Sequence, residues 1–291
     1  MKNLAVIGFA LCVVVIAVVL LPKRGPLNRK FADYGQIIHE VDSEFSRIRV
    51  RETEDGVRTL IFVDEDGRES RQSAINVHRP HELQLEYTKN IFASFLFQPR
   101  QERVLIVGLG GGGMVRFLHH VSPEMFIEAV EIDPAVVAVA AQYFGTQEND
   151  RLKIHVEDAF QFFRDSSHGL YDVIYMDAFL KPTINADAPQ LAQRLKTADF
   201  LREIRARLEP NGVLAFNLIE SDNSTETDLA AIGDVFENVY LFSVPATGNL
   251  VVIAAAHGSR LSQAELEDRA SGLEAEFAGA LPFKQFVEGL R

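Results

Sequence analysis

The chain has 291 residues, of which 47% are hydrophobic and 24% charged, so it can bury a large core and is not a disordered protein. Its formal net charge of −12 argues against a general nucleic-acid binder, because a phosphate backbone favours basic surfaces. With one cysteine, Cys12, the chain has neither an internal disulfide nor a cysteine-built metal site, and we expect no metal cofactor.

An uncharged run of 18 residues, 4–21, is just long enough to cross a bilayer. It lacks the small-residue cleavage site of a secretory signal peptide, which favours an uncleaved anchor over residues 1–22 and leaves a cleaved signal peptide as the alternative. Lys2 precedes the run, and four basic residues follow it: Lys23, Arg24, Arg29 and Lys30. Because cytoplasmic flanks are enriched in Lys and Arg, we expect a membrane-anchored, single-pass protein whose catalytic domain is cytoplasmic.

Residues 36–75 predict a small antiparallel β-region. Around Ile48 and Val50 apolar residues alternate with arginines, which is the period of a half-buried strand. Asp55-Gly56 and Asp66-Gly67 are turn pairs typical of short hairpins. A charged stretch that predicts a helix follows and leads into the next part of the chain.

From residue 104 onward, candidate strands alternate with candidate helices such as 135–144 and 197–208. The strand candidates are 104–107, 126–132, 152–156, 171–176, 212–217, 239–244 and 250–255. Strands that alternate with helices predict a parallel sheet covered on both faces. The last two strands are joined by only five residues, too few for a parallel crossover, so we expect them to pair antiparallel.

This pattern predicts an α/β fold: a doubly wound, mostly parallel seven-stranded sheet of the Rossmann-like, class I methyltransferase type. A small antiparallel β-domain and an N-terminal transmembrane helix precede it. The tail predicts two short polar helices. The expected parts of the chain are the anchor 1–22, a linker with the small β-domain 23–95, the Rossmann-like domain 96–260 and the tail 261–291.

The stretch VLIVGLGGGG, residues 104–113, places a glycine-rich loop between a buried strand and a helix. Ligands of such sheets bind beyond the carboxyl ends of the strands, where Gly108, Gly110 and Gly112 leave the backbone bare. Glu131 ends the second strand 23 residues after Gly108, where a ribose-binding carboxylate is expected. The loop is not followed by the set of basic residues that would balance phosphates, so a nucleoside is favoured over a dinucleotide. The adenosine of S-adenosylmethionine (SAM) fits this description.

Two further acids follow the next two strands. Asp158, next to Ala159, is expected to accept from the exocyclic amine of adenine, and Asp177 to project toward the substrate. Each alone is also a common helix N-cap, but a run of strand ends that supply glycine, acid, acid and acid favours a ligand site. Asn217 ends the next strand. It is a candidate for orienting a substrate amine, with a purely local role in its own loop as the alternative.

These motifs resemble the spermidine synthases and their methyltransferase-like relatives. The resemblance covers residues 45–255 and rests on VLIVGLGGGGMVRF, VEIDP, VEDAFQFF, YDVIYMDAF and LEPNGVLAFNL. It implies that the loop 108–113, Glu131 and Asp158-Ala159 hold SAM or decarboxylated SAM as co-substrate, without a metal. It also implies that Asp177 matches the acid that activates the attacking amine in the aminopropyltransferases.

The chain departs from the spermidine synthase pattern around the amine. Gly111 stands where those enzymes carry an Asp in the glycine loop, and Leu180 where they carry a second acid. Tyr87-Thr88-Lys89 replaces their Tyr-His-Glu stretch, and Phe45-Ser46 replaces a Tyr-Gln pair. Because a polycation is recognised by carboxylates in a closed site, we expect the polyamine pocket to be lost and the nucleoside pocket to be kept.

The sequence therefore predicts an enzyme that transfers a methyl group from SAM to an amine of a small molecule or protein. Methyl transfer needs mainly an aligned nucleophile and a group that accepts its proton, a role that suits Asp177. A polyamine aminopropyltransferase that uses decarboxylated SAM and a non-catalytic nucleoside-binding scaffold are the alternatives. The expected partners are the amine acceptor and, through the N-terminal helix, the membrane, but no nucleic acid. A homodimer is one candidate for the oligomeric state, which the sequence leaves open.

Overall fold

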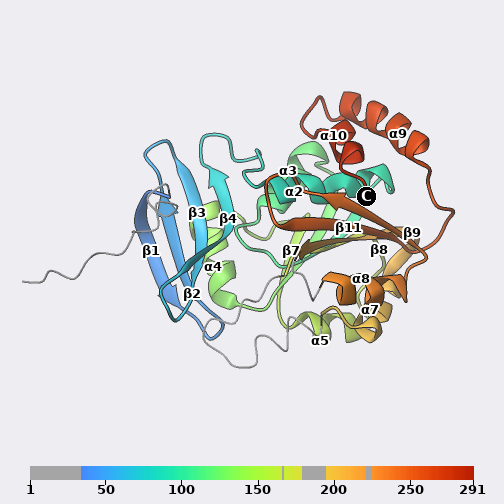
Figure 1. The fold of residues 1–291 in the computed structure, drawn as a ribbon. Helices are drawn as coiled ribbons and strands as arrows, with labels where there is room; N and C mark the ends of the chain where they lie inside the picture. The colour runs from blue at the N-terminus through green and yellow to red at the C-terminus, as the bar shows by residue number, and fades with distance from the viewer. Residues whose placement is uncertain (1–33, 166, 179–194, 221–224) are drawn as a thin grey trace, which may run out of the picture.

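The computed structural model describes residues 34–165, 167–178, 195–220 and 225–291, and it contains two β-sheets (Figure 1). The smaller sheet has four strands in the order β1-β2-β3-β4, and all neighbours are antiparallel. Its strands are β1 (Gln36–Asp42), β2 (Arg47–Glu52), β3 (Val57–Val63) and β4 (Glu69–Asn76). The predicted antiparallel β-region is confirmed.

The alternating sequence of β2 gives the small sheet two different faces. Ile48 and Val50 are fully buried on one face. The arginines between and beside them lie on the other face, where they form ion pairs with Glu40, Asp42 and Glu69. These pairs neutralise the basic stripe, so this face is not a cationic binding surface.

The buried face of the small sheet packs on helix α4 (Pro134–Phe144). Side chains of β2 and β3 form one hydrophobic cluster with Val136 and Val139 of this helix. Arg58 of β3 adds a hydrogen bond by donating through Nη1 to the carbonyl of Tyr143 at 2.9 Å. Helix α4 therefore joins the small sheet to the rest of the molecule.

The larger sheet has seven strands in the order β10-β11-β9-β8-β5-β6-β7. The five strands β5 to β9 are parallel to one another, whereas β11 is antiparallel to both β9 and β10. This arrangement confirms the predicted mostly parallel sheet and its antiparallel hairpin. The strands are β5 (Arg103–Val107), β6 (Phe126–Glu131), β7 (Leu152–Val156), β8 (Tyr171–Met176), β9 (Leu208–Ile219), β10 (Asn238–Ser243) and β11 (Asn249–Ala255).

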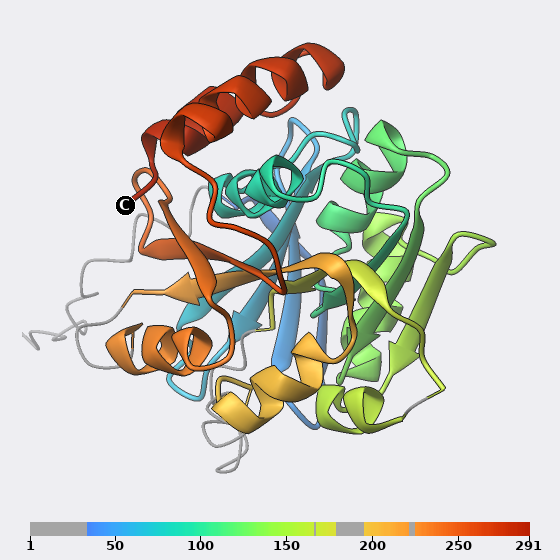
Figure 2. The ribbon, with the colours of Figure 1, turned by 90° about the vertical axis from the view of Figure 1, so that its right-hand side faces the viewer.

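Helices cover both faces of the larger sheet (Figures 1 and 2). Alternate residues of β5 show the two layers, because Val104 and Ile106 belong to one core and Leu105 and Val107 to the other. On the first face lie α2 (Glu86–Asn90), the 3₁₀-helix η1 (Ile91–Leu96), α3 (Gly113–Val121), α9 (Gln263–Glu276) and α10 (Phe283–Glu288). On the second lie α5 (Ala159–Arg164), α7 (Ala198–Arg205) and α8 (Thr225–Gly233).

The structure corrects the expected membrane topology. Within the described part of the chain, no helix is both long and apolar enough to span a membrane. Helix α9 is the longest of those described, with 14 residues, or about 21 Å at a rise of 1.5 Å per residue. A bilayer core is about 30 Å thick. On this finding the prediction of a membrane-anchored, single-pass protein with a cytoplasmic catalytic domain is wrong. The predicted anchor itself, 1–22, lies outside the described residues.

Candidate active site

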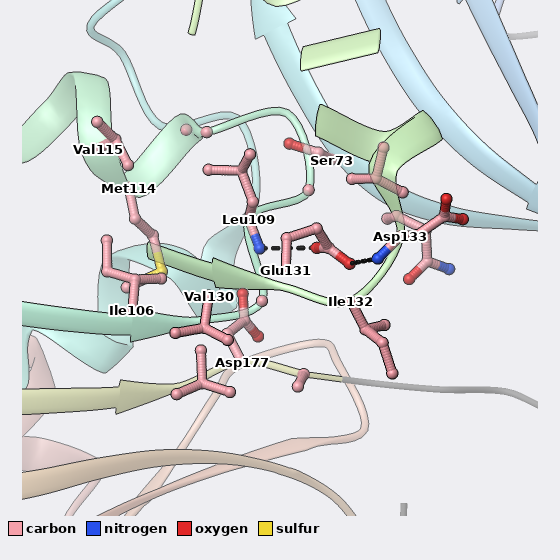
Figure 3. A pocket seen from close by; sticks show the side chains of 18 of the residues that line it. Ser73, Ile106, Leu109, Met114, Val115, Val130, Glu131, Ile132, Asp133 and Asp177 are labelled. Atoms are coloured by element: carbon pink, nitrogen blue, oxygen red, sulfur yellow. Dashed lines mark hydrogen bonds between the residues drawn. The ribbon is translucent and has the colours of Figure 1, made fainter. Parts of the chain in front are cut away.

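A cleft lies at the carboxyl ends of β5, β6, β7 and β8, on the side that faces the small sheet. Figure 3 shows its centre, with the glycine loop, the end of β6 and Asp177 around one space. Strand β4 of the small sheet and the segment before α2 form the opposite wall. All seven residues predicted for the site line this cleft: Gly108, Gly110, Gly112, Glu131, Asp158, Ala159 and Asp177.

Packing within the protein requires glycine at two positions of the loop, whether or not a ligand binds. Gly108 has a φ of +95°, and a Cβ there would lie 2.6 Å from the carbonyl oxygen of Asp177. Gly112 has a φ of +70°, and its Cβ would lie 2.3 Å from Oγ1 of Thr146. Side chains rarely adopt such backbone angles, and neither position has room for one. The glycine-rich sequence thus reflects the close approach of other chain segments as well as space for a ligand.

Arg116 of α3 holds the glycine loop in place through hydrogen bonds. The sequence did not predict this role. Its Nη1 donates to the carbonyl of Gly111 at 2.5 Å, the carbonyl of Phe144 at 3.0 Å and Oγ1 of Thr146 at 2.6 Å. Thr146 Oγ1 donates to the same Gly111 carbonyl at 2.9 Å. Burial lowers the pKa of the Arg116 guanidinium to about 10. The loop is therefore held to the end of α4 by one half-buried cation.

Glu131 lies where β6 meets the glycine loop. Its Oε2 accepts from the backbone N–H of Leu109 at 3.0 Å and its Oε1 from that of Asp133 at 3.1 Å, as Figure 3 shows. Burial raises the pKa of Glu131, although these backbone donors act in the opposite direction. The two bonds fix the carboxylate at the edge of the cleft, and each oxygen keeps a second lone pair for a ligand hydroxyl.

Asp133, two residues later, ties the site to the small sheet. One of its carboxylate oxygens caps α4 by accepting from Ala135 N–H at 2.8 Å. The other accepts from Ser43 Oγ, between β1 and β2, at 2.5 Å. This acid is 2% exposed and the sequence reasoning assigned it no role. Its position before Pro134 is a typical N-cap signal that could have revealed the capping half of its function.

Asp158 also caps a helix. Its Oδ1 accepts from the N–H of Phe160 at 2.9 Å and thereby begins α5, while Ala159 is buried beside it. The capping alternative is therefore present in the structure. It does not exclude a ligand role, because Asp158 lines the cleft as well.

Asp177 is half-buried at the cleft wall and held by two donors. Asn217 Nδ2 donates to its Oδ1 at 2.9 Å, and the hydroxyl of Tyr87 donates to its Oδ2 at 3.3 Å. Burial raises the pKa of Asp177 to about 7, against the opposing effect of both hydrogen bonds. Burial and then Asp177 itself raise the pKa of Tyr87 well above its usual value. A carboxyl group in this range exchanges a proton readily near neutral pH.

Asn217 orients this acid instead of a substrate amine. Its own Oδ1 accepts from Asn249 Nδ2 at 3.0 Å, so the three residues form a chain across β8, β9 and β11. Asn217 is 1% exposed. Neither of its two predicted roles describes this contact, because the register of three neighbouring strands creates it.

The structure shows what fills the space near Gly111. A Cβ at this position would lie 2.8 Å from the ring of Phe144 and 2.9 Å from Oγ of Ser73, so a side chain there would have to displace the Phe144 ring and the Ser73 hydroxyl. Lys89 pairs with Glu86 at 2.7 Å, while Phe45 and Ser46 line the cleft. Leu180 lies outside the described residues.

Comparison with known proteins relates the chain to two kinds of transferase. Residues 86–259 match the family model of the spermine/spermidine synthase domain. The polyamine aminopropyltransferase of Vibrio vulnificus (strain CMCP6) is 31% identical over 241 residues, which cover 81% of this chain and 77% of that protein. The eEF1A lysine and N-terminal methyltransferase of Homo sapiens is 34% identical over 179 residues. That match covers 59% of this chain but 25% of the human protein, so the chain spans about a quarter of this relative.

Two solved structures are also similar to this chain. The crystal structure of human methyltransferase-like protein 13 in complex with SAH has a TM-score of 0.59 and 28% identity, and it matches 67% of this chain and 93% of that chain. A probable spermidine synthase from Corynebacterium glutamicum ATCC 13032 has a TM-score of 0.67 and 21% identity, with 87% and 95% coverage. The second likeness concerns the fold alone.

Proposed function

The chain belongs to the spermine/spermidine synthase family and is a SAM-type transferase, and we propose that it transfers a methyl group from SAM to an amine. The acceptor would be a protein lysine or N-terminal amine, or a small amine. The observation that carries this proposal is the space around Gly111, which Phe144 and Ser73 fill. Aminopropyl transfer to a polyamine would need acids that bind cationic amines, and Gly111 supplies none.

The donor would lie across the carboxyl ends of β5, β6 and β7. Glu131 has fixed oxygens that suit the two ribose hydroxyls, and Asp158 borders the neighbouring part of the cleft. Backbone atoms of the loop 108–113 approach the ligand because Arg116 and Thr146 hold the loop in place. These residues fit a nucleoside. SAM would supply an electrophilic methyl group on a positively charged sulfur.

Asp177 would accept the proton of the acceptor amine. The amine nitrogen uses its lone pair to bond the methyl carbon while the carbon–sulfur bond breaks and its electrons stay on sulfur. The nitrogen then carries the positive charge and loses a proton to the carboxylate of Asp177. Asn217 and Tyr87 hold that carboxylate in one orientation, which is the positioning that proton transfer requires.

A second candidate is a polyamine aminopropyltransferase that uses decarboxylated SAM. The match to the Vibrio vulnificus enzyme favours it, because that match covers 81% of this chain, against 59% for the human methyltransferase. In this reaction an amine of the polyamine acceptor would attack the aminopropyl carbon next to sulfur. The two candidates share the donor site and Asp177 but differ in the group transferred.

Titration calorimetry with SAM, decarboxylated SAM and methylthioadenosine separates the two. We expect SAM to bind more tightly than decarboxylated SAM, and methyl-labelled SAM to label a peptide with a free lysine or N-terminal amine. Putrescine, tested with decarboxylated SAM, should give no aminopropylated product by mass spectrometry. Tighter binding of decarboxylated SAM together with aminopropylation of putrescine would overturn the methyltransferase proposal in favour of the second candidate.

A further inference from the structure

A second cluster of polar side chains lies beside the donor cleft, at the edge of the sheet formed by β6 and β7. Glu128 of β6, His155 of β7 and His168, from the segment between α5 and β8, each bring one ligand atom within 4.8 Å of the others. The Glu128 side chain is 3% exposed, and the two histidine side chains are 22% and 15% exposed. A group of this kind occurs once among the described residues.

Other residues orient the carboxylate of Glu128. Its Oε2 accepts from Arg103 Nη2 at 2.6 Å and from the hydroxyl of Tyr171 at 3.0 Å. Its Oε1 is consequently turned toward the histidines and lies 3.1 Å from Nε2 of His155 and 4.0 Å from Nδ1 of His168. One oxygen is thus held in place by protein donors, and the other faces two imidazole nitrogens.

Each imidazole also has a carboxylate behind its second nitrogen. Nδ1 of His155 lies 3.8 Å from Oε1 of Glu157, and Nε2 of His168 lies 3.8 Å from Oδ2 of Asp165. In metal sites the second nitrogen of a histidine ligand faces a carboxylate, carbonyl or water that fixes the ring. At 3.8 Å these carboxylates do not hydrogen-bond the rings, but each lies near the nitrogen that is not turned to Glu128, so His155 presents Nε2 and His168 presents Nδ1 to Glu128 Oε1.

Packing holds the rings in this position. His168 stacks on Phe162 with ring centres 3.9 Å apart, and His155 meets the same ring edge-on at 5.0 Å. Arg207 donates to the carbonyls of Asp165 and His168, at 2.6 and 3.0 Å, and fixes the backbone that carries the second histidine. The three ligand residues come from different elements, but the fold positions them together.

We propose that Glu128, His155 and His168 bind one divalent transition-metal ion of the zinc class. Two imidazole nitrogens and a carboxylate oxygen are a ligand set that such ions prefer, whereas Mg²⁺ and Ca²⁺ prefer oxygen alone. Around tetrahedral zinc, ligand atoms lie about 3.3 Å apart, from bonds of about 2.0–2.1 Å. The Glu128–His155 pair already has this spacing at 3.1 Å, and the His168–Glu128 distance of 4.0 Å needs to shorten by less than 1 Å.

The local charge supports a dication. Glu128, Glu157 and Asp165 supply three carboxylates, and two guanidinium groups, Arg103 on Glu128 and Arg207 beside Asp165, offset part of this charge. The partly exposed histidines leave a path from solvent, so water can complete the coordination. The ion would fasten the segment between α5 and β8 to the edge strands. Its site is separate from the transfer reaction, because the three ligand residues do not line the cleft.

The test uses the full chain, made without a polyhistidine tag and stripped of metal with a chelator. Titration with Co²⁺ alone should show one saturable site with the visible absorption of four- or five-coordinate cobalt, and Zn²⁺ should displace the cobalt. His155→Ala and His168→Ala should each weaken Co²⁺ binding at least about tenfold. His120→Ala is the matched control, because His120 stacks on another histidine, His81, with ring centres 4.4 Å apart. It should bind Co²⁺ as the wild type does.

Zn²⁺ should also raise the midpoint of thermal unfolding of the wild type but not of His168→Ala. Absence of a saturable site in the stripped wild type would overturn the proposal. So would unchanged Co²⁺ affinity in both ligand variants, or an equal loss in His120→Ala. Should His155→Ala fail to fold, His168→Ala decides, because His168 lies in a connecting segment. Unchanged SAM binding by the variants shows that their clefts are intact.

Discussion

Asn217 Nδ2 and Asp177 Oδ1 lie 2.9 Å apart and join the carboxyl ends of β9 and β8, with Asp177 on the cleft wall and Asn217 buried next to it. The amide is itself fixed by Asn249, so Asp177 has a set orientation before any substrate arrives. A carboxyl group that is half-buried, oriented and close to neutral in pKa is suited to general base catalysis.

Asp177→Asn should leave donor binding nearly unchanged and slow the transfer at least about a hundredfold. The amide has the shape of the carboxylate and can still accept from Tyr87 or Asn217, but it cannot take a proton from the acceptor. The measurement is single-turnover transfer with a saturating donor, together with calorimetric titration of SAM. Transfer at the wild-type rate would mean that Asp177 is not the base.

The transfer rate should rise with pH and level off above a midpoint near 7, because Asp177 acts only when ionised. Asn217→Ala should move this midpoint upward, since the hydrogen bond from Asn217 is the larger of the two that lower the pKa of Asp177. The measurement is kcat/KM as a function of pH for both proteins. A purely structural Asn217 would change the rate at every pH by the same factor and leave the midpoint in place.

Stability should also depend on this group. Asp177 has a folded pKa of about 7 against 3.8 for an ordinary Asp, so between these values the folded chain binds more protons than the unfolded chain. The free energy of unfolding of the wild type should therefore fall, relative to Asp177→Asn, as the pH rises from about 4 to about 7, and stay level above. Urea unfolding of both proteins at several pH values gives this difference. Parallel curves would show that the pKa of Asp177 is not raised.

Glu131→Ala should weaken SAM binding by about 1.5–3 kcal/mol, the usual worth of hydrogen bonds to a charged group. The carboxylate is held by Leu109 and Asp133 at the edge of the cleft, where the ribose is expected. Calorimetric titration measures the loss, and Glu124→Ala, at an exposed acid paired with Arg151, is the control. Unchanged affinity in a folded Glu131→Ala protein would show that the ribose lies elsewhere.

Arg116→Ala should lower the free energy of unfolding by about 2–3 kcal/mol and weaken SAM binding, because several carbonyl and hydroxyl acceptors lose a charged donor. Chemical unfolding and calorimetry measure the two effects. Arg151→Ala removes an exposed arginine and should leave both quantities close to the wild type. If Arg116→Ala were as stable as the wild type and bound SAM equally well, the hydrogen bonds of Arg116 to the glycine loop would have no energetic role.

Much of the fold follows from local sequence patterns. Several strands of the larger sheet were predictable because they are short apolar runs that end at a glycine or a polar residue, as at Val107 and Met176. The turn at Asp55-Gly56 followed from the left-handed conformation that glycine allows, and Gly56 has a φ of +79°. The strand-end rule then brought Glu131, Asp158 and Asp177 to one cleft without any knowledge of the distances.

Contacts between distant segments were beyond single-sequence reasoning. Arg116 meets Phe144 and Thr146 only because the glycine loop and the end of α4 are neighbours in space. Glu128 and His155 meet because of the register between β6 and β7, which places His155 opposite Val130. The residue pattern of a single strand does not give its register against a neighbouring strand.

The start of α2 shows a different limit. The charged stretch 81–97 was predicted as one helix, yet α2 begins at Glu86 and continues as the 3₁₀-helix η1. All six residues of η1 are buried, so packing against the sheet decides its geometry in place of the amphipathic period.

The packing of the small sheet on α4 has a consequence for how the chain folds during synthesis. The inner face of the sheet, with Ile48, Val50 and Leu60, leaves the ribosome well before Val136 and Val139, the residues that cover it. Chain elongation proceeds at about 5–20 residues per second, so this apolar face waits several seconds for its partner. The N-terminal sheet is translated first but cannot complete its core first, and its exposed face is where a nascent-chain chaperone would be needed.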